Sequence, residues 1–290
     1  MKKIILATTM LAATAGFASA DVSISGAGRM GLVQKNIDGN VETQFSSRLR
    51  IKFSASGTTD GGLSFGGAVR NDQDGVGNTA NGNSTVFVSG AFGTLTFGDV
   101  NGGAGDNLVG QISGVGFTNL GDTNEIGFLP GDSTSVTAVR YDYTSGPLSV
   151  SLGASQTNAN DFAHKASVAV KYDGGTYNVA VGYETVTGNH LLSAKVGATF
   201  GAATVQVKYV SSAKVLGCCG QKGKNQVGVS LDYAVSPSLT ATAFFTDHAY
   251  GYIAKGLGAT YDLGGGAKVV GGVINNGDDT LADLGMTLAF

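Results

Sequence analysis

The feature that most constrains the fold is a period of two in hydrophobicity, which recurs in short segments from residue 21 to the end of the chain. In residues 22–32 the even positions are apolar or glycine, whereas the odd positions include Ser23, Ser25 and Arg29. This is the period of a β-strand with one apolar and one polar face, because a helix would repeat every 3.6 residues. The chain is therefore predicted to be all-β.

The alternating segments are short, regular and even in number. The predicted strands cover residues 22–32, 43–55, 63–70, 84–91, 93–100, 135–144, 148–156, 165–173, 177–185, 191–200, 203–211, 225–234, 238–246, 252–262, 267–274 and 281–290. Strands of about ten residues with weak alternation are typical of bacterial outer-membrane barrels. We expect a transmembrane antiparallel 16-stranded β-barrel.

A soluble β-sandwich also contains many short strands and is the main alternative fold. Tyrosines argue against it, because they recur on the apolar face near strand ends, where a membrane-interface girdle would place them. They are Tyr141, Tyr143, Tyr172, Tyr183, Tyr209, Tyr233 and Tyr261.

The chain divides into a targeting segment and one barrel domain. Lys2 and Lys3 precede an apolar run that ends in a small-residue cleavage site, so residues 1–20 are predicted to be a signal peptide and residues 21–290 the barrel. Expected long connections include 35–42, 71–83, 101–134, 157–164 and 212–224, which alternate with tight turns. Long loops would lie at the outer end, with both chain termini in the periplasm.

The longest connection, Asn101–Thr134, shows no sustained alternation and no Lys or Arg. A segment of this length without strands of its own is usually functional. We expect it to fold inward as a constriction loop that narrows the pore. Its acidic residues are Asp106, Asp122, Glu125 and Asp132.

The arginines all occupy the polar phase of their strands and precede residue 141. They are Arg29, Arg48, Arg50, Arg70 and Arg140. Because an arginine on the lipid face costs about 2–4 kcal/mol at the bilayer midplane, the phase predicts that they point into the lumen. Opposite the loop carboxylates they would create a transverse field across a water-filled opening, which admits polar solutes and disfavours apolar ones.

The sequence gives little support for a nucleic-acid partner, an enzyme active site or a metal site. The net charge of −3 and the lack of a basic patch with aromatic residues exclude a nucleic-acid partner, and no nucleophile is paired with His164, His190 or His248. We therefore expect no enzyme activity and no cofactor.

Asp72 and Asp74 lie in a partial calcium-loop pattern without its terminal glutamate. Adjacent Cys218 and Cys219 could form a strained disulfide, pair with another chain or stay free.

Over most of its length beyond residue 20, the chain resembles the alphaproteobacterial, Rhodobacter-type general porins. The resemblance is carried by residues 45–48, 56–60, 89–93, 115–118, 261–266 and 282–285. It implies an outer-membrane, multi-pass channel for passive diffusion of small hydrophilic solutes and ions. It also implies homotrimers in contact with lipid and lipopolysaccharide, an inward third loop, calcium near acidic loops, and recognition of Phe290 by the assembly machinery.

The sequence departs from the resemblance at Gln111 and Gly114, where acidic residues are expected, and at the adjacent cysteines. A less acidic opening weakens the inference of cation selectivity and of loop-bound calcium. The main alternative is a substrate-specific channel of the same fold, with a binding site at the constriction. An outer-membrane enzyme and a plugged structural barrel are the other rivals.

Overall fold

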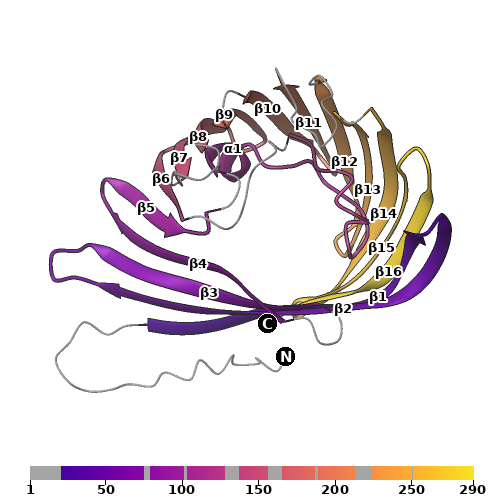
Figure 1. Ribbon diagram of the computed structural model, residues 1–290, viewed down its shortest axis with the longest axis horizontal. Coiled ribbons are helices and arrows are strands. Elements are labelled where there is room, and N and C mark those ends of the chain that lie inside the picture. The colour runs from indigo at the N-terminus through magenta and orange to yellow at the C-terminus, as the bar shows by residue number, and fades with distance from the viewer. Residues whose placement is uncertain are drawn as a thin grey trace.

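A computed structural model of the protein describes residues 21–74, 79–100, 103–127, 137–155, 165–186, 189–212, 224–249 and 251–290. Its strands close into one antiparallel barrel in which each strand pairs with its neighbours in sequence and β1 pairs with β16 (Figure 1). The elements are β1 (Asp21–Ile37), β2 (Asn40–Thr58), β3 (Ser64–Asp74), β4 (Thr79–Gly90), β5 (Gly93–Gly98), α1 (Gly103–Leu108), β6 (Ala138–Ser145), β7 (Leu148–Ser155), β8 (Lys165–Asp173), β9 (Tyr177–Val186), β10 (Asn189–Phe200), β11 (Ala203–Ser212), β12 (Gln226–Ser236), β13 (Leu239–Asp247), β14 (Ile253–Gly264), β15 (Ala267–Asn275) and β16 (Thr280–Ala289).

The predicted barrel is confirmed strand by strand, and closure satisfies the backbone groups that lipid cannot. No helix in the described part of the chain is long and apolar enough to cross a membrane. The predicted signal peptide (residues 1–20), Asp132 and both cysteines lie outside the described residues.

The prediction of a long loop is wrong at two places, where the structure has strands instead. Residues 35–42 form the ends of β1 and β2, joined by a two-residue turn at Asp38 and Gly39 with φ of 51° and 86°. Such positive φ values at both central positions are those of a type I′ hairpin turn, for which Asp-Gly is favoured. Residues 71–74 and 79–83 likewise belong to β3 and β4 rather than to a loop. Polar residues extend these strands because their backbones still pair, although their side chains show no apolar alternation.

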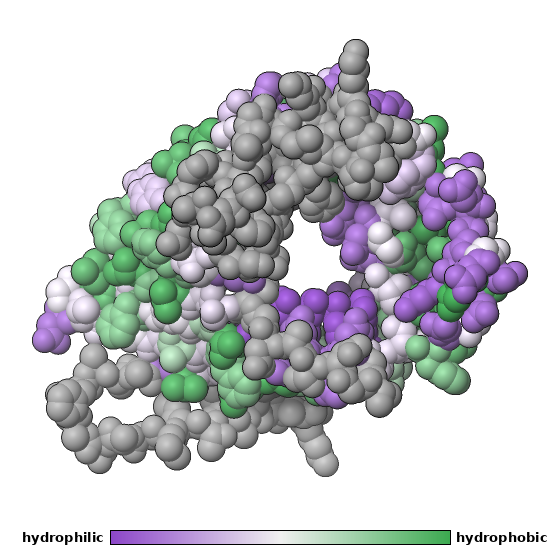
Figure 2. Space-filling view, viewed as in Figure 1, coloured by the Kyte–Doolittle hydropathy of each residue, from purple (hydrophilic) through white to green (hydrophobic). Residues whose placement is uncertain are grey.

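The outer face carries the apolar phase of the strands. Val22, Leu49, Val181 and Leu257 are among many large apolar side chains that stay exposed. Figure 2 shows hydrophobic residues on the outside of the barrel. The predicted tyrosines share this face, with Tyr143, Tyr172, Tyr183, Tyr209, Tyr233 and Tyr261 all exposed. Exposure of this kind suits a wall in contact with lipid.

The apolar core lies between the wall and the long loop, not in the centre of the barrel. Ile112, Val115 and Leu120 of the loop pack with Val33, Phe244, Ala254 and Ile274 of the strands. Small wall residues make room for the loop: a Cβ at Gly258 would lie 2.8 Å from Cβ of Val115. Figure 1 shows the loop and α1 inside the barrel, along the wall that runs from β7 to β16.

Candidate functional site

The arginines of β1, β2 and β3 form one patch on the inner wall. Arg29 pairs in register with Arg48, and Arg48 with Asp74 on the next strand. One row further along, Arg50 pairs with Asp72, and Lys52 then pairs with Arg70. Alternation thus places the side chains on one face, as predicted. We call Arg29, Arg48, Arg50 and Arg70 the arginine wall.

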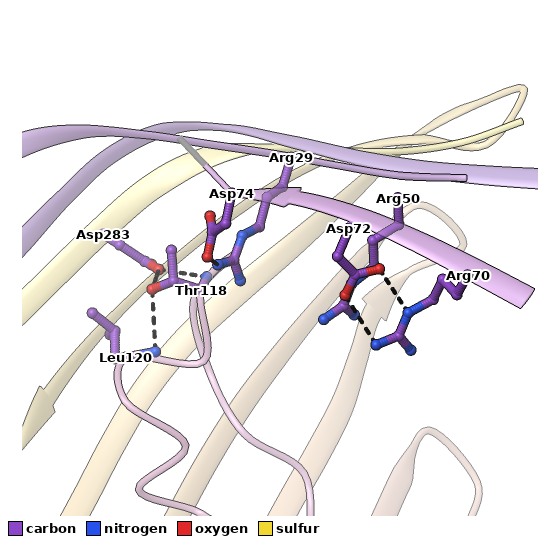
Figure 3. Close-up of polar contacts among 8 residues, drawn as sticks. All are labelled: Arg29, Arg50, Arg70, Asp72, Asp74, Thr118, Leu120 and Asp283. Atoms are coloured by element: carbon purple, nitrogen blue, oxygen red, sulfur yellow. Dashed lines mark hydrogen bonds and ion pairs between the residues drawn. The ribbon is translucent and has the colours of Figure 1, made fainter. Parts of the chain in front are cut away.

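Carboxylates of β3 hold the arginine wall in place. Asp72 lies between two arginines: its Oδ2 accepts from Nε of Arg50 at 2.9 Å, and its Oδ1 accepts from Nε of Arg70 at 2.7 Å (Figure 3). Asp74 lies 3.8 Å from Arg29, which is too far for a hydrogen bond. Arg48 has no ion pair of its own among the residues that the structure describes. The wall is therefore partly neutralised but keeps an excess of positive charge.

Arg140 lies apart from this wall, on β6. Its Nε donates to Asp142 at 2.8 Å, and Asp142 also accepts from Asn107 of α1 at 2.8 Å and from Ser151 at 2.6 Å. Arg140 thus belongs to the network that fixes the start of the loop. The sequence placed it correctly on the inner face but did not separate it from the arginine wall.

Two lysines on the neighbouring strands β10 and β11 hold the middle of the loop. Lys195 donates to the backbone oxygen of Gln111 at 3.0 Å, and Lys208 donates to Oε1 of the same residue at 2.8 Å. Lys208 also reaches the backbone oxygen of Ile126 at 2.7 Å. A neutral glutamine at position 111 thus fills a bridging role between wall and loop.

The tip of the loop is tied to the last strand. Oδ2 of Asp283 accepts from the backbone nitrogen of Thr118 at 2.8 Å and from its hydroxyl at 2.7 Å (Figure 3). Nearby, Ser113 donates to Asp232 at 2.5 Å. These anchors distribute the loop over the wall from α1 to β16. The remaining opening therefore lies between the loop and the strands that carry the arginine wall, where Figure 2 shows hydrophilic residues at its border.

A buried histidine fixes the returning part of the loop. Nε2 of His248 lies 2.9 Å from the backbone oxygen of Thr123 and 3.0 Å from the Thr246 hydroxyl, and the ring stacks on Tyr252 at 4.2 Å. Burial lowers the pKa of His248 below its ordinary value, although the Thr123 hydrogen bond and Asp247 oppose this shift. The ring is therefore neutral near pH 7 and donates to the loop.

The structure describes the side chains of two of the four loop carboxylates. Asp122 is exposed near the tip, and Glu125 is half-buried and engaged. The backbone of Asp106 lies in α1, and Asp132 falls outside the described residues. Among the described residues, the ion pairs of the arginines run to Asp72, Asp74 and Asp142 of the wall and none runs to the loop.

The calcium pattern is also placed differently from the expectation. Asp72 and Asp74 lie in β3, and their carboxylates face guanidinium groups. No cluster of three or more His, Cys, Asp or Glu residues that could hold a metal occurs in the described ranges. A cation at Asp72 would have to displace two arginines.

Sequence reasoning missed the anchors Lys195, Lys208 and Asp283. A signal existed, because each occupies the polar phase of a strand, where a charged residue must find water or a partner. Pairing them with Gln111 or Thr118 required the path of the loop, which the sequence does not contain.

Comparison with known proteins gives a consistent result. A profile described as Gram-negative porin matches residues 7–283. The chain is 33% identical to a porin from Rhodobacter capsulatus, over 93% of this chain and all of the relative. Among solved structures, two mutants of the Rh. blastica porin superpose with TM-scores of 0.80 and 0.78 at 23% and 24% identity, over 93% of this chain and all of each relative.

Proposed function

Because the chain belongs to the Gram-negative porin family and forms an outer-membrane channel for passive diffusion, we propose that the arginine wall and the inward loop set its selectivity. The observation that carries this proposal is the position of the loop, which is anchored from α1 to Asp283, while the ion pairs of the arginine wall run to β3 and, among the described residues, none runs to the loop. Small hydrophilic solutes and ions pass between them. The same proposal assigns a smaller share of the field to Arg140 and to the loop carboxylates Asp106, Asp122, Glu125 and Asp132.

The electrostatics favour weak ion preference over tight binding. Two unit charges about 10 Å apart interact by about 0.4 kcal/mol in bulk water and by about four times as much at an effective dielectric constant of 20. Arg50 and Arg70 share Asp72, so much of their field is cancelled locally. Arg48 contributes the least compensated charge. The field at the opening can therefore orient a passing solute, but it is too weak to hold the solute there.

The loop can be tested as a size filter. Replacing residues 103–127 with a short Gly-Ser linker should raise the size limit for sugars in liposome swelling, because the loop fills one side of the lumen. An insertion at the Gly201-Ala202 turn, which joins β10 to β11 at the other end of the barrel, is the matched control. An unchanged sugar limit in a folded loop-deleted barrel would contradict the proposal.

The distribution of tyrosines supports a homotrimer. Every tyrosine in a strand lies between β6 and β14, whereas β1–β5 and β15–β16 contain none. Tyrosines mark the boundary between apolar and polar lipid regions, including lipopolysaccharide head groups. The sector without tyrosines, which includes the exposed Met30, is therefore proposed to face neighbouring subunits.

The subunit interface can be tested by matched charges. Met30→Arg should dissociate trimers in sedimentation measurements, because it places a charge in the proposed interface. Leu192→Arg carries the same change at a similarly exposed site on β10 and should leave trimers intact. Trimers that survive the first change, or are lost equally in both folded variants, would refute the assignment.

The same geometry supports a channel without catalysis. His248 is buried under the loop and shared between a carbonyl and a threonine hydroxyl, so it does not face the solute path. His190 stacks on Tyr183, an exposed residue of the outer face. Neither is placed to activate a nucleophile for a passing solute.

A further inference from the structure

A half-open recess lies beside the opening, between the loop tip and the first three strands of the barrel. It has a volume of about 690 Å³, within the range of about 300–1,000 Å³ that is common for small-molecule sites. Arg29 and Asp74 form one side, where Figure 3 shows them next to Thr118 of the loop tip. The recess is thus distinct from the row of Arg50, Asp72 and Arg70.

The charged side of the recess is incompletely paired. Nη2 of Arg29 lies 3.8 Å from Oδ2 of Asp74, beyond hydrogen-bond distance, and the buried Nε of Arg29 has no acceptor among the described residues. The Asp74 side chain is 62% exposed. Both groups can therefore gain hydrogen bonds from a solute. The tight Arg50–Asp72–Arg70 cluster, by contrast, is already satisfied.

The overall charge of the lining is balanced. Lys35 adds a second positive group and Asp278 a second negative one, and both are exposed. A simple anion would therefore be repelled by the two carboxylates, and a simple cation would be repelled by Arg29. A ligand with both signs in close proximity satisfies both sides at once.

The remaining part of the lining is apolar. Val33, Leu120, Leu281 and the ring of Tyr252 lie together in the recess and in the core cluster beneath it. A hydrocarbon side chain placed against these residues would be removed from water, which favours binding. The charged and apolar parts are thus next to each other in one cavity.

We propose that this recess is a weak binding subsite for α-amino acids with an apolar side chain, located beside the constriction. The carboxylate of the solute binds Arg29, its ammonium group binds Asp74, and its side chain rests on Leu120, Leu281 and Tyr252. The inference rests on the proposed solute path between loop and arginine wall. Its effect is to concentrate such amino acids at the opening, while other small solutes still diffuse past.

The test is block of the open channel by L-leucine in a planar bilayer. Leucine should reduce the current saturably. N-acetyl-leucine, 3-methylbutylamine and glycine, which lack the ammonium group, the carboxylate and the side chain respectively, should each block at about tenfold higher concentration or not at all. Arg29→Gln and Asp74→Asn should weaken the leucine block by about tenfold. Lys52→Gln removes a charge from the same wall outside the recess and should keep the block.

Two outcomes would overturn the subsite: equal block by leucine and its three analogues, or unchanged leucine block in both recess variants. Saturation-transfer NMR of leucine with the folded protein in detergent separates this failure from failure of the channel itself. Transfer to leucine that is lost in Arg29→Gln supports the subsite whatever the conductance. A conducting channel without transfer leaves the porin intact and removes the subsite.

Discussion

The link between Asp283 and Thr118 predicts how firmly the loop tip is held. Asp283→Ala removes two hydrogen bonds to a carboxylate, at 2.7 and 2.8 Å. Hydrogen bonds to charged groups contribute about 1.5–3 kcal/mol each. Part of this is offset, because the mutation also removes a buried carboxylate whose Oδ1 has no hydrogen-bond partner among the described residues.

We estimate a net loss of about 2–4 kcal/mol in docking of the loop tip, which raises the undocked population by about 30- to 1,000-fold. The strand itself should persist, since β16 pairs along its length with β1 and β15. The loop tip alone is expected to move. The open channel should then show larger current fluctuations and brief partial closures.

The assay is single-channel recording of the variant, with amide hydrogen exchange of residues 115–121 as a structural readout. Asp283→Asn keeps one acceptor and should give an intermediate effect. Thr287→Val changes the inner face of the same strand without removing a described hydrogen bond to the loop, and should behave as wild type. Wild-type current noise and unchanged exchange in Asp283→Ala would refute the tether.

Three further predictions concern the histidine under the loop, a glycine of the wall and the expected calcium. His248 has a lowered folded pKa, so the unfolded chain takes up the proton first; its stabilising effect is complete above about pH 6.5 and is lost as the pH falls below that value. Lowering the pH should therefore reduce the protection factors of the amides around Thr123, taken relative to the intrinsic exchange rate at each pH, more in the wild type than in His248→Gln; equal acid sensitivity would contradict this. Gly258→Ala should lower stability by about 1–3 kcal/mol, because its Cβ would lie 2.7 Å from a backbone oxygen and 2.8 Å from Val115, whereas Gly28→Ala, with nothing closer than 3.7 Å, should be neutral in thermal melts. Calcium near the acidic loops, which the resemblance implies, predicts that a chelator lowers the melting temperature sharply; an unchanged melt would contradict this expectation.

The barrel and the direction of the arginines could be predicted from sequence because both depend only on a local period of two. Arg48 and Arg50 share a phase that lipid cannot accept, so their inward direction needs no knowledge of distant residues. The carboxylates that pair with the arginine wall could have been predicted from the sequence as well. Arg70, Asp72 and Asp74 are spaced by two and share a face once residues 71–74 are taken as strand.

The path of the loop could not be predicted, because distant contacts decide it. Nothing in the glycine-rich run Gly103–Leu108 favours a helix, and α1 is held by packing on β7, β8 and β9 and by the bond from Gly105 to Glu184 at 3.1 Å. Gln111 likewise gains its role from Lys195 and Lys208, which lie more than eighty residues later. Local propensity carries no information about such partners.

The arginine wall is the central element of this account, and the reversal potential in a salt gradient tests it most directly. Arg48→Gln combined with Arg70→Gln should shift the preference toward cations, with a change in the anion-to-cation permeability ratio of about twofold to tenfold per charge. Arg140→Gln, on β6 and paired with Asp142, should shift it less. A reversal potential that stays at the wild-type value in the double variant would show that the ions pass elsewhere.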